Sequence, residues 1–252
     1  MNDGVDIRKS AYFRFYAELN DFIPGSRKQR SFKHSFKTPV TVRELLESFG
    51  VPLSEVDLVL SNGEPVDLSY MVQEEDNISV YPVFETLDIS PVKITNKPPL
   101  RVTKFILDAH LGKLAKYLRM LGFDTLYDND FKDPEIISIA ASQHRIILTR
   151  DKVLLKSKEV NYGYYVRAIE KHEQLREVVK KFDLNSQFKS FSRCMTCNSL
   201  LEQVEKNKIK LMVDEDTFRI FKEFYLCKNC KKVYWKGSHF LRMEKMIRDL
   251  CD

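Results

Sequence analysis

Three patterns of apolar and polar residues follow one another along the chain, and each predicts a different kind of structure. In the first, residues 11–17 (AYFRFYA) alternate with the period of a half-buried strand, and residues 41–50 have the spacing of a short amphipathic helix. Residues 56–67 predict two strands joined by a tight turn at Asn62-Gly63, and residues 77–84 (NISVYPVF) predict a closing strand. This order predicts a small mixed sheet with one helix across it.

The short helix also carries signals for where it begins and ends. Thr41 and Glu44 have the spacing of a capping box, in which each side chain bonds the backbone N–H of the other residue. Gly50 suits the carboxyl end because glycine adopts a positive φ without strain. One apolar stripe is expected to pack on the sheet, formed by Val42, Leu45, Leu46 and Phe49.

The second pattern alternates strands with helices. Strands are predicted at residues 101–108, 124–127, 145–149 and 162–166, and helices at residues 111–122, 133–144 and 170–182. Such alternation is typical of a parallel sheet that is built from right-handed crossovers and flanked by helices. The fold class predicted for this part is therefore α/β.

Breaks in composition divide the chain into three expected domains. Residues 88–100 (DISPVKITNKPPL) contain three prolines and few large apolar side chains, as an extended linker does. A second, polar break lies at residues 183–193. The domains are therefore predicted at residues 1–90, 100–183 and 190–252.

Length and composition support more than one hydrophobic core, since the chain has 252 residues of which 43% are apolar. No run approaches the roughly 20 apolar residues that cross a bilayer, and the first residues lack the apolar core of a secretion signal. We therefore expect a cytoplasmic protein with no membrane partner.

Charge is distributed unevenly along the chain. Residues 1–95 hold 10 Lys and Arg against 15 Asp and Glu, whereas residues 96–252 hold 31 against 21. The basic part is the one expected to meet an anion such as a nucleic acid, although a surplus of lysine can also be an ordinary solvated surface.

Acidic residues follow the predicted strands of the middle domain or begin its helices. Asp108 follows the strand KFIL, Asp151 follows IILTR, and Asp133 begins the helix DPEIISIA with Glu135 in its first turn. Parallel strands end at one edge of their sheet, so these side chains are expected to gather in one crevice. Each aspartate could instead serve only as a helix cap, but three at one edge favour a shared role.

A cluster of carboxylates favours a hard divalent cation, because like charges repel unless a cation neutralises them. Mg²⁺ or Mn²⁺ prefers oxygen ligands and can activate a water for phosphodiester hydrolysis. Basic side chains suited to a phosphate backbone lie near the acids in the sequence: Lys113, Lys116, Arg119, Arg150 and Lys152. The first three form a loose stripe along one predicted helix. This stripe could bind a phosphate backbone, or it could be an ordinary solvated surface.

At these residues the chain resembles a known family. The segments FILDAHLGKLAKYLRMLGFDT, DPEIISIA and IILTRDKVLL are similar to those of the Mut-seven C-terminal ribonuclease family, a branch of the PIN-like nucleases. The resemblance implies a metal-dependent ribonuclease in which Asp108, Asp133 and Asp151 hold Mg²⁺ or Mn²⁺, with Glu135 as an alternative to Asp133. Many relatives place a fourth acid shortly after the TRD turn, where this chain continues with Lys152, which leaves room for a sparser, single-ion site.

The flanking domains resemble known modules, and their arrangement around a PIN-like sheet is one found in that family. The motifs FRFYAEL and ISVYPVF are similar to ubiquitin-like β-grasp domains, a group that includes sulfur carriers. Carriers act through a Gly-Gly tail, which does not follow the closing strand here, so transfer chemistry is not expected. This domain is interpreted as a docking or substrate-presenting module that could receive a protein partner, or as a structural appendage.

Two C-x-x-C pairs in the last domain predict a zinc ribbon. Cys194 with Cys197 (CMTC) and Cys227 with Cys230 (CKNC) are separated by 29 residues. Four thiolates in two such turns complete a tetrahedral Zn²⁺ site without an open position, which makes its role structural. A redox pair would need only one C-x-x-C, and a reducing cytosol disfavours disulfides. His239 is expected at the surface or facing RNA rather than on the ion.

The sequence around the second pair, KEFYLCKNCKKVYWKGSHF, combines basic with aromatic residues. Rings such as Trp235 could stack on unpaired bases while the lysines meet phosphates. Zinc ribbons of this size also bury such rings in their core, and we expect about half of these rings to be core residues.

Together these observations predict a metal-dependent ribonuclease that cuts RNA phosphodiester bonds, acting on single-stranded RNA, tRNA or rRNA. The ribbon is expected to help hold the RNA, and the β-grasp domain to select or recruit it. The main alternative is a catalytically inactive RNA-binding or ribosome-associated adaptor. The ribonuclease assignment follows from the resemblance, whereas the acids and the charge indicate only phosphodiester chemistry.

Overall fold

A computed structural model of the chain describes residues 8–37, 39–82 and 102–251. These residues pack as two compact units. One contains the described residues of Met1–Arg101 together with Asp133–Tyr165, and the other contains Val102–Lys132 and the described residues of Val166–Asp252. The predicted linker at residues 88–100 lies outside the described residues, as does the end of the predicted strand at residues 77–84. The three domain boundaries stay predictions.

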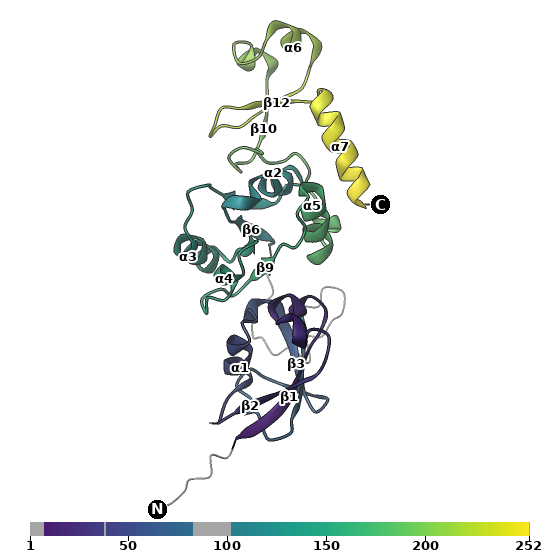
Figure 1. Ribbon diagram of the computed structural model, residues 1–252. Helices are drawn as coiled ribbons and strands as arrows, with labels where there is room; N and C mark the ends of the chain where they lie inside the picture. The colour runs from purple at the N-terminus through teal and green to yellow at the C-terminus, as the bar shows by residue number, and fades with distance from the viewer. Residues whose placement is uncertain (1–7, 38, 83–101, 252) are drawn as a thin grey trace, which may run out of the picture. The chain divides into compact units, whose positions relative to one another are not determined.

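A five-stranded mixed sheet makes up most of the first unit (Figure 1). Its strands are β1 (Lys9–Phe15), β2 (Phe32–Phe36), β3 (Val56–Ser61), β4 (Glu64–Val66) and β5 (Asn77–Pro82). They are arranged in the order β2-β1-β5-β3-β4. β1 and β5 are parallel, and the other neighbouring strands are antiparallel. The predicted β-grasp fold is therefore confirmed.

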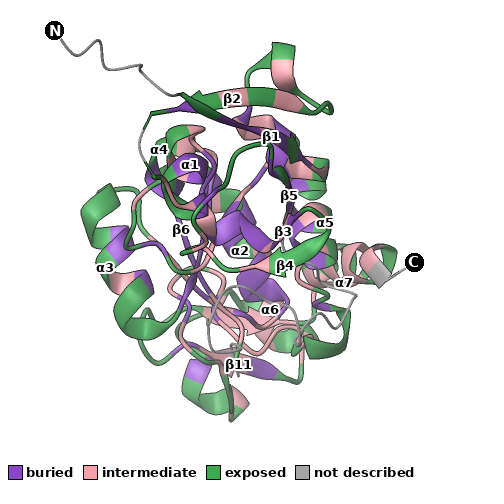
Figure 2. Ribbon diagram, turned by 90° about the horizontal axis from the view of Figure 1, so that it is seen from below, coloured by how far each residue is buried: buried purple, intermediate pink, exposed green. Residues whose placement is uncertain are grey.

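Helix α1 (Val42–Ser48) packs against this sheet, because its apolar residues face the core. Val42, Leu45 and Leu46 are buried in one cluster with Phe13 and Phe15 of β1 (Figure 2). The helix stripe and the strand alternation that were expected from the sequence thus meet in a common core.

The predicted turn and cap signals are confirmed. The Glu44 N–H donates to Thr41 Oγ1 at 3.3 Å, and the Thr41 N–H donates to Glu44 Oε2 at 2.8 Å, which completes the capping box. Gly50 has a φ of +74° after the helix. Asn62 and Gly63 have φ values of 54° and 91°, as the tight turn between β3 and β4 requires.

The rest of the first unit comes from residues 133–165. It contains α3 (Asp133–Gln143), β8 (Ile146–Thr149), α4 (Lys152–Leu155) and β9 (Gly163–Tyr165). β8 is buried at every position, as a central strand of a parallel sheet is, and it pairs in parallel with β9. Short 3-10 turns complete the unit: η1 (Ala17–Phe22), η2 (Gly25–Arg27) and η3 (Leu53–Glu55).

The second unit supplies the other strands of the parallel sheet. It contains β6 (Lys104–Leu107), η4 (Ala109–Leu111), α2 (Gly112–Met120), β7 (Asp124–Tyr127), α5 (Lys171–Lys181) and η5 (Asn185–Gln187). β6 and β7 are parallel, and the sheet has the order β7-β6-β8-β9. The apolar residues at helical spacing are buried, namely Leu114, Ala115 and Leu118 of α2 and Leu175, Val178 and Val179 of α5, and Arg119, Met120 and Gln174 are buried as well. The predicted parallel sheet with flanking helices is confirmed.

A small antiparallel sheet follows in the second unit. Its strands, in spatial order, are β10 (Glu202–Val204), β11 (Phe224–Leu226) and β12 (Val233–Trp235). The segment between β10 and β11 contains η6 (Lys206–Ile209) and α6 (Glu215–Ile220). This insertion explains the long spacing between the two cysteine pairs.

The last element of the second unit is α7 (Ser238–Cys251), which has 14 residues and lies where no helix was expected. The signal that could have identified it is the recurrence of apolar residues at Phe240, Met243, Ile247 and Leu250. Among the described residues, no helix combines the length and the apolar character that crossing a bilayer requires.

Candidate functional site

Asp108 lies in the second unit, immediately after the buried strand β6. Its side chain caps η4, because Oδ1 accepts a hydrogen bond of 2.9 Å from the backbone N–H of His110. The residue is only 7% exposed, whereas Ala109 and His110 are exposed. The end of a buried strand therefore carries a carboxylate that the next turn holds in a fixed orientation.

Asp151 and Asp133 lie in the first unit, each at the start of a helix. Asp151 follows β8 and caps α4, since its Oδ1 accepts a hydrogen bond of 2.7 Å from the Val153 N–H. Asp133 is the first residue of α3, and both it and Glu135 are exposed. The metal site that would join these acids to Asp108 stays a prediction.

Arg119 is buried, which differs from the exposed stripe predicted for α2. Its exposed fraction is 4%, and its guanidinium donates to the backbone carbonyl oxygens of Thr125 (2.9 Å), Met195 (3.3 Å) and Thr196 (2.8 Å). Positions six apart are about 120° apart around a helix, so Arg119 faces inward while the two lysines of the stripe face solvent. The expected exposure of Arg119 is therefore corrected: its Nε and Nη1 groups are bonded within the fold, and its contact with RNA stays a prediction.

Lys152, also expected to contact RNA, is held by the β-grasp part of the first unit. Its ammonium donates to the Asp21 carbonyl oxygen at 2.5 Å and lies 5.3 and 5.0 Å from the ring centroids of Phe22 and Tyr165. The Tyr165 N–H donates at 2.7 Å to the carboxylate of Glu55, a residue that is 3% exposed. The segment from α4 to β9 therefore contacts η1 and η3 of the β-grasp part, and the contact of Lys152 with RNA stays a prediction.

The other basic and aromatic residues singled out for RNA contact are accessible to different degrees. Lys113 and Lys116 of α2 are exposed, and Arg150, just before α4, is half-buried. Trp235 of β12 is half-buried, with its ring 6.4 Å from that of Phe224. Their contact with RNA stays a prediction.

Four cysteines of the second unit form a cluster with the geometry of a metal site. The Sγ atoms of Cys194, Cys197, Cys227 and Cys230 all lie within 4.8 Å of one another. The shortest separations are 3.3 Å between Cys197 and Cys227 and 3.5 Å between Cys194 and Cys230. A tetrahedron with Zn–S bonds of about 2.3 Å has S–S edges of about 3.8 Å, so the cluster can hold a metal such as zinc.

The two cysteine pairs lie in equivalent turns. In the first turn Asn198 has a φ of 71°, and its N–H donates to the Cys194 carbonyl oxygen at 2.9 Å. In the second turn Lys231 has a φ of 60°, and its N–H donates to the Cys227 carbonyl oxygen at 2.9 Å. Burial disfavours the Cys197 thiolate, but hydrogen bonds with the backbone and hydroxyl of Ser199 outweigh it and lower the pKa of this thiol to about 5. The first turn therefore favours the Cys197 thiolate, whereas burial raises the pKa of Cys227 and of Cys230 in the second turn.

The first cysteine turn is bonded directly to β7 and α2. Asn198 is 8% exposed; its Oδ1 accepts from the Thr125 N–H at 2.9 Å, and its Nδ2 donates to the Asp124 carboxylate at 2.8 Å. Arg193 lies 3.7 Å from the same carboxylate and donates to the Asn198 carbonyl oxygen at 2.9 Å. Together with Arg119, these contacts join the cysteine cluster and the edge strand of the parallel sheet within the second unit.

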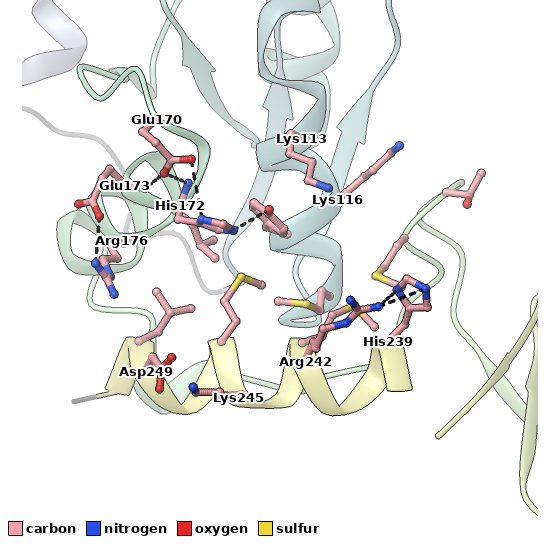
Figure 3. A pocket seen from close by; sticks show the side chains of 18 of the residues that line it. Lys113, Lys116, Glu170, His172, Glu173, Arg176, His239, Arg242, Lys245 and Asp249 are labelled. Atoms are coloured by element: carbon pink, nitrogen blue, oxygen red, sulfur yellow. Dashed lines mark hydrogen bonds and ion pairs between the residues drawn. The ribbon is translucent and has the colours of Figure 1, made fainter. Parts of the chain in front are cut away.

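A groove with a volume of about 870 Å³ is lined by α2, the start of α5, the cysteine turns and α7 (Figure 3). Lys113 and Lys116 of α2 line it on one side, and Arg242 and Lys245 of α7 line it on another. Among the residues that line the groove, Lys113, Lys116, Lys232 and His239 were identified from the sequence as candidates for RNA contact. The others were missed because the groove is assembled from segments that are far apart along the chain.

Two aromatic side chains bridge α2 and α5 in this groove. The Tyr117 hydroxyl and His172 Nε2 share a hydrogen bond of 3.0 Å, and the two rings are stacked with centroids 5.4 Å apart. Burial and the nearby Glu170 carboxylate raise the pKa of Tyr117, which keeps its hydroxyl protonated. The pair presents a flat, neutral phenol beside the basic residues of the groove.

Two models of known protein families match this chain, one in its N-terminal part and one in the remainder. A family model described as Mut7-C RNAse domain matches residues 103–247, which is more than half of the chain. A second model, described as Mut7-C ubiquitin, matches residues 8–88. No curated protein matches the chain.

Several solved structures are similar to parts of the chain. The solution structure of the Haloferax volcanii HVO 2177 protein is 19% identical and covers 32% of this chain and 88% of its own, with a TM-score of 0.27. Structures of small archaeal modifier protein 1 and of SAMP1, both from the same organism, are 16% and 20% identical. They cover 30% and 31% of this chain and 99% of their own, each with a TM-score of 0.25.

Proposed function

The chain belongs to the family of the Mut7-C RNAse domain, and on that premise we propose that it is a metal-dependent ribonuclease which hydrolyses RNA phosphodiester bonds. Its proposed metal ligands are Asp108, Asp133 and Asp151, with Glu135 as the alternative to Asp133. One observation carries the proposal: Asp108 and Asp151 follow β6 and β8, which are neighbours in the sheet order. The carboxyl ends of neighbouring parallel strands open onto one edge of a sheet.

The donor set suits a hard divalent cation, because every proposed ligand is a carboxylate. When bound, Mg²⁺ or Mn²⁺ supplies Lewis acidity toward a phosphate oxygen and the attacking water. The chain supplies orientation, since the His110 and Val153 N–H groups hold the carboxylates of Asp108 and Asp151. Because Lys152 follows Asp151 where relatives carry a further acid, we propose a sparse site with one ion.

The cysteine cluster is proposed to bind Zn²⁺ for a structural purpose, since four thiolates leave no coordination position open for a substrate. The first cysteine turn is bonded to β7 through Asn198. Loss of the ion should therefore disturb the nuclease sheet as well as the ribbon.

RNA is the proposed partner, either single-stranded or as tRNA or rRNA, in the cytoplasm. The β-grasp domain is proposed to recruit a protein or RNA partner. Its contacts with Lys152 and Tyr165 support a second role, which is to steady the segment that follows Asp151.

Cleavage of a labelled single-stranded RNA in the presence of Mn²⁺ tests the proposed activity. Asp108→Asn and Asp151→Asn should each slow cleavage by at least about 100-fold, because even outer-shell partners of a metal contribute about 10- to 100-fold. Asparagine caps a helix as well as aspartate does, so these variants remove the charge and keep the turn.

A matched control is Asp183→Asn, which changes an exposed aspartate with a φ of 43°, a conformation that asparagine also tolerates. It should leave the cleavage rate unchanged. A wild-type protein that binds RNA without cleaving it would instead favour the catalytically inactive RNA-binding or ribosome-associated adaptor.

A further inference from the structure

The groove between α2, α5 and α7 is distinct from the proposed metal site, because none of the proposed metal ligands lines it. All of its residues belong to the second unit. Its composition indicates what it could hold.

Basic side chains outnumber acidic ones in the groove. The acids are Glu170, Glu173 and Asp249, of which two are engaged within α5. Glu170 accepts the N–H groups of the first helical turn, and Glu173 pairs with Arg176 at 2.9 Å. The lysines and arginines that line the groove are Lys113, Lys116, Arg176, Lys232, Arg242 and Lys245. The groove is therefore suited to a ligand with several negative charges.

Apolar side chains line the same groove, and those of α7 are poorly covered. From Ser238 to Leu250 no residue of α7 is buried, although the helix has a clear apolar face. Figure 3 shows that face turned toward α2 and α5. The apolar lining consists of Met120, Leu175, Met195, Met243, Met246 and Leu250. A ligand with apolar surfaces between its charges would cover them.

We infer that this groove binds a segment of single-stranded RNA, with phosphates on the basic side chains and bases against Met195, Met243, Met246 and the Tyr117–His172 pair. The choice of RNA rests on the proposed ribonuclease function, whereas the lining by itself requires a polyanion with exposed flat groups. A duplex fits less well, because its bases are stacked inside the helix and would leave the apolar lining uncovered.

A second cavity extends the surface toward Trp235. It has a volume of about 360 Å³ and shares Met195, Tyr234 and Met243 with the groove. Its wall includes the rings of Phe191, Tyr225, Trp235 and Phe240. This aromatic cavity offers a place for one unstacked base at the end of the bound strand.

Fluorescence anisotropy of a labelled single-stranded RNA tests the inference, with the full chain in its zinc-loaded form and no added Mg²⁺ or Mn²⁺. Lys116→Ala and Arg242→Ala should each weaken binding about fivefold near 0.1 M salt. Each phosphate contact contributes about 0.7 to the slope of log affinity against log salt concentration for a single strand. At 0.1 M salt, one contact fewer therefore lowers the affinity by a factor of about 10 to the power 0.7, which is about fivefold. Both variants should therefore also lower that slope by about 0.7.

The chain offers matched controls on two helices of the groove. Lys180→Ala on α5 and Arg248→Ala on α7 remove the same charges from exposed positions that do not line the groove. Affinity and salt slope should stay at the wild-type values. Equal losses in groove and control variants, or equal affinity for the single strand and for its duplex, would overturn the inference.

The readout separates the groove from the nuclease. If the wild-type chain binds RNA through Lys116 and Arg242 but does not cleave it with Mn²⁺, the groove is supported and the ribonuclease proposal fails. If the chain cleaves RNA while both groove variants bind as the wild type does, the ribonuclease proposal survives and the groove is rejected.

Discussion

Among single residues, Asn198 shows how a cysteine turn is joined to a parallel strand. Its φ of 71° lies in a region that asparagine tolerates better than most residues, which lets the turn close behind Cys197. From that position the side chain reaches Asp124 and the backbone of Thr125 in β7. One residue thus completes the cysteine turn and ties it to the sheet edge.

The variant Asn198→Ala should lower the free energy of unfolding by about 1–3 kcal/mol, because the buried Thr125 N–H loses its acceptor. Urea denaturation of the zinc-loaded protein, followed by circular dichroism, measures the change. Asn185→Ala, at an exposed position of η5, should change it by less than about 0.5 kcal/mol. Equal stabilities for the two variants would show that the bond to β7 contributes nothing.

The sequence predicts some site residues and not others, for a physical reason. The strand-end aspartates and the cysteine pairs are marked by short-range signals, namely a buried strand before the acid and the C-x-x-C spacing. Arg119 and Lys152 carry no such signal, because their partners include Met195 and Asp21, which lie 76 and 131 positions away in the chain. A cation that binds backbone carbonyls and one that binds phosphate look the same in sequence.

At the level of secondary-structure elements, most of the fold follows from local periodicity. The β-grasp strands, α1 and the alternating strands and helices of the parallel sheet all have a clear period of 2 or 3.6. Three α-helices were not anticipated: α4 has four residues, α6 has six, and α7 lies outside the predicted helices although it has an apolar face. Helices of four or six residues are too short to show a period, whereas the apolar residues of α7 do recur at helical spacing, so this helix could have been predicted.

The segment after Asp151 contacts the β-grasp part of the first unit through Lys152 and Tyr165. The Lys152 ammonium donates a hydrogen bond to the Asp21 carbonyl oxygen. It also makes cation–π contacts with the rings of Phe22 and Tyr165. Lys158 makes a more exposed pair with Glu47 at 3.3 Å. The two lysines differ in burial and should differ in their contribution to stability.

Lys152→Met keeps the aliphatic stem and removes the charge, so it should raise amide hydrogen exchange across α4 and β9 by about 10-fold, given that a charged hydrogen bond contributes about 1.5 kcal/mol or more. Native-state exchange followed by mass spectrometry detects this change. Lys158→Met, whose ion pair is largely exposed, should leave exchange in the same peptides nearly unchanged. If both variants exchange as the wild type does, the β-grasp domain does not steady this segment.

For the whole molecule, the proposed function depends on acids that are far apart in the sequence. Asp108 belongs to one unit, and Asp133 and Asp151 belong to the other. The proposal that they share one cation does not follow from local sequence patterns, since it depends on the order of the strands that precede Asp108 and Asp151. The family match and the strand order support that use, and direct observation of the ion would test it.

The most direct measurement is an anomalous difference map from crystals of the protein soaked in Mn²⁺. The account predicts a Mn²⁺ peak at coordination distance from carboxylate oxygens of both Asp108 and Asp151, and no such peak in crystals of Asp151→Asn. A map in which Mn²⁺ occupies only unrelated surface carboxylates, or in which the peak survives the Asp151→Asn substitution, would contradict the account.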